Sequence, residues 1–103
     1  MTKKYTFYIG LNDKDTKKQL VTESEVLCLL DKVFDNYTVY ITSGRYKYFD
    51  GTVENETTIV ATYFDFVDEL NETKIKNITK FLKNQLNQEL ILVEIQETNT
   101  QLI

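Results

Sequence analysis

The dipeptide Asp50-Gly51 stands inside a long run of strand-like residues, and it restricts the fold more than any other feature. Both residues tolerate positive φ, and such a dipeptide is the strongest short-range signal for a two-residue β-hairpin turn. With these residues as the turn, Lys47 faces Glu54, and Arg45 likewise faces Glu56. A slip by one residue would lose both opposite-charge pairs, so we expect this register, in a hairpin with arms of about thirteen residues.

Two segments with helical periodicity flank the hairpin. Thr22 and Glu25 have the spacing of a capping box, and the apolar stripe that follows predicts a helix that ends near Asn36. Asn71 is the expected N-cap of a second helix with one apolar face and one lysine-bearing face. Each helix therefore has one side that must be buried against another part of the chain.

Alternating segments at residues 4–11 and 89–96 supply the first and last strands. The order strand, helix, strand, strand, helix, strand predicts an α+β, ferredoxin-like βαββαβ fold. Both helices should lie on one face of a four-stranded antiparallel sheet, with the first and third strands in the centre. The length of 103 residues suits a single domain over residues 1–103, and the tip of the long hairpin should extend past the helices.

The hairpin register divides the sheet residues between two faces. The face toward the helices is expected to carry Val39, Ile41, Val60 and Phe64. The opposite face has no helix to cover it, and it should carry Ile59, Ala61 and a candidate contact surface of Tyr8, Tyr40, Tyr46, Tyr48, Val53 and Tyr63. An exposed aromatic patch of this kind marks an interface in many small proteins, although tyrosine is also common on solvated strands.

The leading hypothesis is a non-catalytic interaction protein that uses this tyrosine-rich face. We expect first that the protein self-associates as a homodimer, and second that it binds a different protein. The alternative is an RNA or single-stranded nucleic-acid module, in which Tyr8 and Tyr63 on the central strands would stack bases. A net charge of −4 argues against a surface that mainly grips phosphates.

Catalysis is not expected from the composition. The chain has no His, which removes the commonest general base and neutral metal ligand, and its one cysteine, Cys28, should be a buried and inert thiol. No cofactor and no metal are expected. Carboxylates at Asp13 and Asp15, and again at Asp65, Asp68 and Glu69, leave a carboxylate-dependent metal enzyme as a second alternative.

The N-terminal residues show no signal-peptide pattern, and no apolar run approaches membrane-spanning length. A cytoplasmic location is therefore expected, in the host cytoplasm if the protein is encoded by a phage.

Two segments resemble known proteins. YIGLNDKDTKKQ at residues 8–19 and TVYITSGRYKYFDGTVENETT at residues 38–58 look like a family of small uncharacterised proteins from phages and mobile elements of low-GC Gram-positive bacteria. The resemblance implies such an origin and a cytoplasmic setting. By analogy with other small acidic proteins of these elements, it suggests an accessory or counter-defence factor. It identifies no functional residue.

Overall fold

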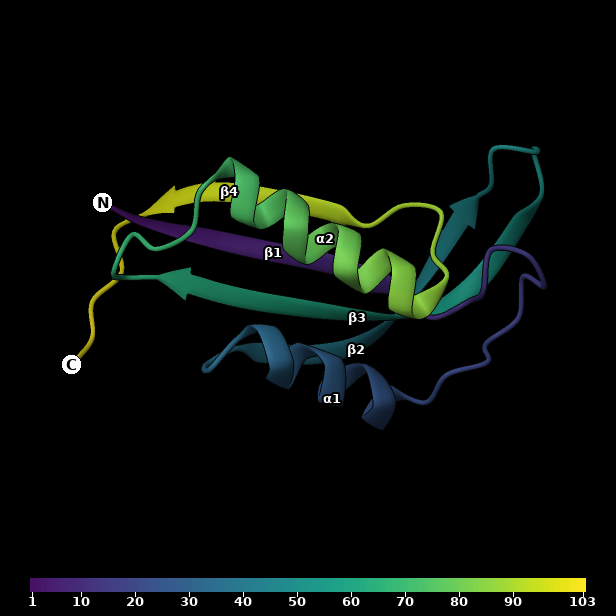
Figure 1. Cartoon of the computed structure of the whole chain (residues 1–103), viewed down its shortest axis with the longest axis horizontal. Coiled ribbons are helices and arrows are strands. Elements are labelled where there is room, and N and C mark those ends of the chain that lie inside the picture. The colour runs from purple at the N-terminus through teal and green to yellow at the C-terminus, as the bar shows by residue number, and fades with distance from the viewer.

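The computed structural model describes residues 1–103 and contains the six expected elements in the expected order (Figure 1). They are β1 (Thr2–Gly10), α1 (Glu23–Val33), β2 (Thr38–Lys47), β3 (Val53–Asp65), α2 (Glu72–Leu86) and β4 (Leu92–Thr98). The strands form one antiparallel sheet in the order β2-β3-β1-β4, and both helices lie on the same face of it. The ferredoxin-like fold and its central strands are thus confirmed. No helix is long and apolar enough to cross a membrane.

The helix starts follow the capping patterns in the sequence. The backbone N–H of Glu25 donates to Thr22 Oγ1 at 3.1 Å, and the Thr22 N–H donates back to the Glu25 carboxylate at 3.3 Å. The N-cap of α2 is Asn71, as expected. However, α1 ends at Val33 rather than near Asn36, because Phe34 leaves the helix in an extended conformation and buries its ring in the core.

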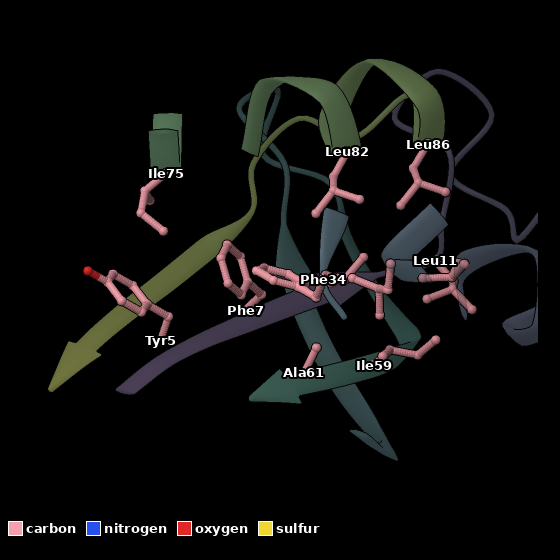
Figure 2. Close-up of a cluster of buried hydrophobic side chains, with 12 residues drawn as sticks. Tyr5, Phe7, Leu11, Phe34, Ile59, Ala61, Ile75, Leu82 and Leu86 are labelled. Carbon is pink, nitrogen blue, oxygen red and sulfur yellow. The ribbon is translucent and has the colours of Figure 1, made fainter. Parts of the chain in front are cut away.

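The core lies between the helices and the two central strands. Figure 2 shows Phe7 of β1 and Phe34 beside each other above Ala61 of β3. The ring centroids of Phe7 and Phe34 are 5.4 Å apart. α1 contributes Val26 and Leu30, and α2 contributes Ile75, Leu82 and Leu86. The apolar stripes of both helices are therefore buried on the sheet, as their periodicity predicts.

The expected hairpin register is wrong by one residue. Lys47 pairs with Val53 and Arg45 with Asn55, so neither predicted charge pair lies directly across the strands. The turn is longer than predicted, because the Gly51 N–H donates to the Tyr48 carbonyl and the Tyr48 N–H donates to the Thr52 carbonyl. Residues 49–51 thus form a three-residue loop in which Gly51 takes a φ of 92°.

This shift reverses the expected faces of β3. Ile59 and Ala61 point into the core, and Tyr63 stacks on Phe34 with the ring centroids 4.9 Å apart. Val53 has the same strand parity, so both Val53 and Tyr63 lie on the opposite face from Tyr46 and Tyr48. Tyr63 and Val53 are therefore not part of the uncovered face on which the sequence placed them.

The face without helices carries a short apolar row across all four strands. Tyr40, Val60, Tyr8 and Leu92 are consecutive partners in the sheet registers. Val60 is only 2% exposed although no helix covers it, whereas Tyr40 is 58% and Leu92 is 66% exposed. The prediction that Val60 and Phe64 lie on the face toward the helices is therefore also wrong. We call Tyr40, Val60, Tyr8 and Leu92 the open-face row.

Candidate functional site

The outer part of the β2–β3 hairpin bends past the end of β1 and meets the segment between α2 and β4 (Figure 1). Side chains from these segments surround a small indentation, and we call them the hairpin cluster. Its members are Tyr46, Tyr48, Glu56, Gln88, Glu89 and Leu90. Tyr46 and Tyr48 belong to the predicted contact surface, but Tyr48 is buried at 5% exposure rather than displayed on a protruding hairpin.

The two tyrosines form one side of the cluster. Their rings meet edge to face with centroids 4.8 Å apart, and the Tyr46 hydroxyl donates to Glu89 Oε2 at 2.8 Å. Burial and this hydrogen bond raise the pKa of Tyr46 to about 12. Burial, with the nearby Glu56 carboxylate as the next cause, also raises the pKa of Tyr48. Both phenols therefore stay protonated at neutral pH and can donate hydrogen bonds.

Glu56 lies on the same face of the hairpin as the two tyrosines. Its half-buried carboxylate accepts a hydrogen bond from the Asn12 backbone N–H at 3.1 Å and forms no ion pair with any Lys or Arg. Burial raises the pKa of Glu56, and the Asn12 hydrogen bond opposes that rise only in part. The cluster thus contains an unneutralised carboxylate next to aromatic rings, which is an environment that attracts a cation.

The loop between β1 and α1 borders the cluster and is held by charged and amide groups. The Asn87 side-chain amide donates to the carboxylates of Asp13 and Asp15, each at 2.8 Å. Lys17 pairs with Asp50 at 2.5 Å, and its Nζ lies 5.3 Å from the centre of the Tyr48 ring. Hydrogen bonds from the Lys17 ammonium and from Thr52 lower the pKa of Asp50 to about 2. The loop is therefore tied to both the hairpin tip and the end of α2.

Two of the carboxylates named from the sequence also accept backbone hydrogen bonds from residues close in sequence. Asp13 also accepts hydrogen bonds from the backbone N–H groups of Asp15 and Thr16, and Asp65 accepts those of Glu69 and Leu70. No three His, Cys, Asp or Glu side chains gather in a set suited to hold a metal ion. Cys28 is exposed on α1, and its assignment as a buried thiol was wrong.

The remaining predicted residues lie elsewhere. Tyr8 and Tyr40 are on the open-face row. Tyr63 donates a hydrogen bond to Glu69 at 3.2 Å beside a groove of mixed polarity, at the opposite end of the molecule from the hairpin. Because Tyr8 and Tyr63 occupy opposite faces, they do not form the base-stacking pair that the nucleic-acid alternative required.

Sequence reasoning missed most of the hairpin cluster. The sequence pattern predicts Glu56 only as a cross-strand partner of Arg45, and Glu89 only as the start of a strand. Gln88 and Asn12 carried no recognisable signal. Gly10 was the one available hint, because a glycine at the end of a regular strand often marks the close approach of another group.

The fold is shared with solved structures of two kinds. A phage SAM lyase in complex with S-methyl-5′-thioadenosine is 22% identical, with a TM-score of 0.73 over 93% of this chain and 81% of that one. The apo state of a phage SAM lyase is 19% identical, with a TM-score of 0.69 over 91% and 78% of the two chains. The periplasmic divalent cation tolerance protein CutA from Archaeoglobus fulgidus is 7% identical, with a TM-score of 0.61 over 99% and 88%. No protein-family model matches the sequence, and no curated protein matches it.

These comparisons correct one expectation and qualify another. The prediction that the chain is not an enzyme is contradicted, because a phage SAM lyase, a catalytic protein, shares the fold over 93% of this chain and 81% of its own. The absence of His does not exclude chemistry that uses carboxylates and tyrosines. The resemblance to phage proteins agrees with the likeness to a phage enzyme, whereas the narrower assignment to low-GC Gram-positive hosts has no support here.

Proposed function

We propose that this chain is an enzyme that cleaves S-adenosylmethionine, with the hairpin cluster as the part of its active site that binds the positively charged groups of the substrate. The observation that carries the proposal is the Glu56 carboxylate, half-buried beside Tyr46 and Tyr48 without a cationic partner. The fold shared with a phage SAM lyase, one example of which holds S-methyl-5′-thioadenosine, supports this choice of substrate. A phage enzyme that removes S-adenosylmethionine would deprive host methyltransferases of their methyl donor, which suits a counter-defence role.

The charge of the substrate matches the chemistry of the cluster. S-adenosylmethionine carries a sulfonium cation and an ammonium group, and both are attracted by carboxylates and by the faces or hydroxyls of aromatic side chains. In a partly desolvated site these attractions are stronger than in water. Glu56 and Glu89 supply negative charge, and Tyr46 supplies the aromatic wall, with the buried Tyr48 packed edge to face against it.

Cleavage to S-methyl-5′-thioadenosine breaks the bond between sulfur and the γ-carbon of the amino-acid chain, and the bonding electron pair moves to sulfur. In one balanced route, the substrate's own carboxylate oxygen attacks the γ-carbon, which closes a five-membered lactone. In the other, a base removes a β-proton, and the remaining fragment leaves as the vinyl amino acid. The first route needs no protein base, so a chain without His can perform it if it holds the substrate in a reactive conformation.

Glu56 has a distinct task in each route. For the lactone route, its carboxylate binds the substrate ammonium and orients the carboxylate nucleophile toward the γ-carbon. For the elimination route, Glu56 is the base, and its raised pKa brings proton uptake closer to neutral pH. The Tyr46 hydroxyl donates its proton to Glu89, so in both routes Tyr46 presents its ring and a hydroxyl oxygen that can accept a hydrogen bond at the edge of the site.

The experiment is incubation of the purified protein with S-adenosylmethionine, followed by mass spectrometry of both products. We expect S-methyl-5′-thioadenosine together with either the lactone or the vinyl amino acid. Glu56→Gln should lower the rate about 100-fold, whereas Glu97→Gln, a control on an exposed part of β4, should not change it. A wild-type protein that leaves the substrate intact, or a Glu56→Gln variant with full activity, would refute the proposal.

We also propose that the protein self-associates through the open-face row. Tyr40 and Leu92 on the two edge strands are largely exposed and apolar in part, while β1 and β3 join them into a continuous strip. Light scattering across a concentration series tests this for the wild type and for Tyr40→Ser with Leu92→Ser. A wild type that is monomeric at every concentration would contradict self-association.

A further inference from the structure

We propose that Gln88 is a positioning residue that sets the location of the Glu56 carboxylate through Asn12, and this inference rests on the proposed function. Gln88 and Asn12 are uncharged amides buried at 7% and 8% exposure, at a place where three separate segments meet. Buried polar side chains are unfavourable unless they are hydrogen-bonded, so the hydrogen bonds of Gln88 and Asn12 indicate the role of these two residues.

Residue 12 is held from three directions. The Gln88 side-chain amide donates to the Asn12 carbonyl oxygen, and the Asn12 side-chain amide donates to the Asn55 carbonyl at 3.1 Å. With these two contacts in place, the Asn12 backbone N–H donates to Glu56 Oε2. Asn55 directly precedes Glu56, so Asn12 grips both the carboxylate and the backbone beside it. The hydrogen-bonded path runs from Gln88 through Asn12 to Glu56.

Glu89, the next residue after Gln88, holds the side of the hairpin cluster that contains Tyr46. Glu89 accepts the Tyr46 hydroxyl and the Phe49 backbone N–H, the latter at 3.2 Å to Oε2. Residues 88 and 89 therefore fix a carboxylate on one side and a phenol on the other. The Asn87 C-cap, with a φ of 48°, ends α2 and directs these two residues toward the cluster.

Two further features indicate that the path from Gln88 through Asn12 positions the Glu56 carboxylate and is not only a packing contact. Gly10 leaves open the space into which the carboxylate is drawn, since a Cβ there would lie 2.2 Å from Glu56 Oε1. In addition, no cation holds Glu56 in place, so the Asn12 N–H is the one protein donor on its carboxylate. A loss of the Gln88 bond should thus free Asn12 and then Glu56. A displacement of about 1 Å at a reacting group can lower a rate about 100-fold.

The test compares Gln88→Met, which keeps the size and removes the amide donor, with Gln96→Met on the exposed part of β4 as the matched control. We expect Gln88→Met to lower kcat at least about tenfold while KM changes less than about threefold. NMR titration of the Glu56 carboxyl supplies a readout that needs no catalysis. Because burial raises the Glu56 pKa and the Asn12 hydrogen bond opposes that rise, a displaced carboxylate in Gln88→Met should titrate away from its wild-type pKa.

The outcomes separate the two proposals. If the wild type produces no S-methyl-5′-thioadenosine, the proposed function fails, while the Glu56 titration still tests the positioning role. If Gln88→Met changes neither kcat nor the Glu56 pKa, the positioning role is refuted even in an active enzyme. Should Gln88→Met fail to fold, the wild-type Asn12 amide proton is followed instead. Its chemical shift must change with the Glu56 titration, and an unresponsive Asn12 amide would overturn the inference.

Discussion

The Glu56 carboxylate occupies the space that a side chain on Gly10 would need, with Oε1 only 2.2 Å from an ideal Cβ at that position. Gly10 is the last residue of β1, and Glu56 lies on β3. The absence of one methyl group on a central strand thus allows a charged group to lie against the sheet within the hairpin cluster. A substitution at Gly10 can displace the Glu56 carboxylate without removing any functional group of the hairpin cluster, so it tests the position of that carboxylate directly.

Gly10→Ala should move the Glu56 carboxylate away while leaving the fold intact. The Cβ would meet the end of a flexible side chain, not backbone, and Gly10 has an ordinary φ. We expect a loss of about tenfold or more in S-adenosylmethionine cleavage. Gly44→Ala is the matched control, because Gly44 lies directly across from Glu56, yet its Cβ would meet Thr58 Oγ1 at 2.6 Å and not the Glu56 carboxylate. Equal losses in both variants, measured under identical conditions, would contradict a specific role for the carboxylate.

Replacing Glu56 should also change the stability of the protein. Burial raises the folded-state pKa of Glu56 above the ordinary value of 4.5, so ionisation of this group disfavours the fold. That cost is complete above the raised pKa and disappears as the pH falls below 4.5. Glu56→Gln should therefore raise the Tm at neutral pH, and the gain should vanish in acid. A variant with the same gain at every pH would show that ionisation is not the cause.

The fold could be predicted because its strongest signals are local. The capping box at Thr22 and the N-cap at Asn71 depend on residues close in sequence, and the order of helical and alternating segments admits few topologies. The register could not be predicted from the same kind of evidence. The two expected charge pairs contribute only about 0.2 to 1 kcal/mol each. Burial of one large apolar side chain such as Ile59 contributes about 1.5 to 3 kcal/mol, which favours the observed register.

Most of the hairpin cluster could not be predicted from the sequence for a related reason. Tyr46 and Tyr48 attracted attention as aromatic residues, but their partners come from distant parts of the chain. Asn12 and Gln88 are 76 positions apart, and the hydrogen-bonded path from them to Glu56 exists only in the folded chain. No spacing rule links such residues. The absence of His is also a weak argument against catalysis, because carboxylates and tyrosines can carry out acid–base chemistry and bind cations.

The ion pair between Lys17 and Asp50 should be visible in the titration of Asp50. The Lys17 hydrogen bond is the largest cause of the low pKa of about 2, so Lys17→Met should raise that pKa toward 3.8. In the wild type, the stabilisation from Asp50 is present above 3.8 and is lost as the pH falls through about 2. NMR titration of the carboxyl group tests this, with Lys14→Met as an exposed control in the same loop. An unchanged Asp50 pKa in Lys17→Met would show that Thr52 alone holds it low.

The three-residue turn can be tested at Gly51, whose φ of 92° lies in the region that favours glycine. A Cβ at this position would contact nothing within 4 Å, so any loss of stability reports backbone strain alone. Gly51→Ala should cost about 1 kcal/mol, which corresponds to a Tm lower by about 4–8 °C, because L-residues disfavour positive φ. Gly51→Asn should lose less, since Asn visits this region more readily. If both variants were as stable as the wild type in thermal unfolding, residue 51 would not require the left-handed conformation, which would contradict the three-residue turn with Gly51 at a φ of 92°.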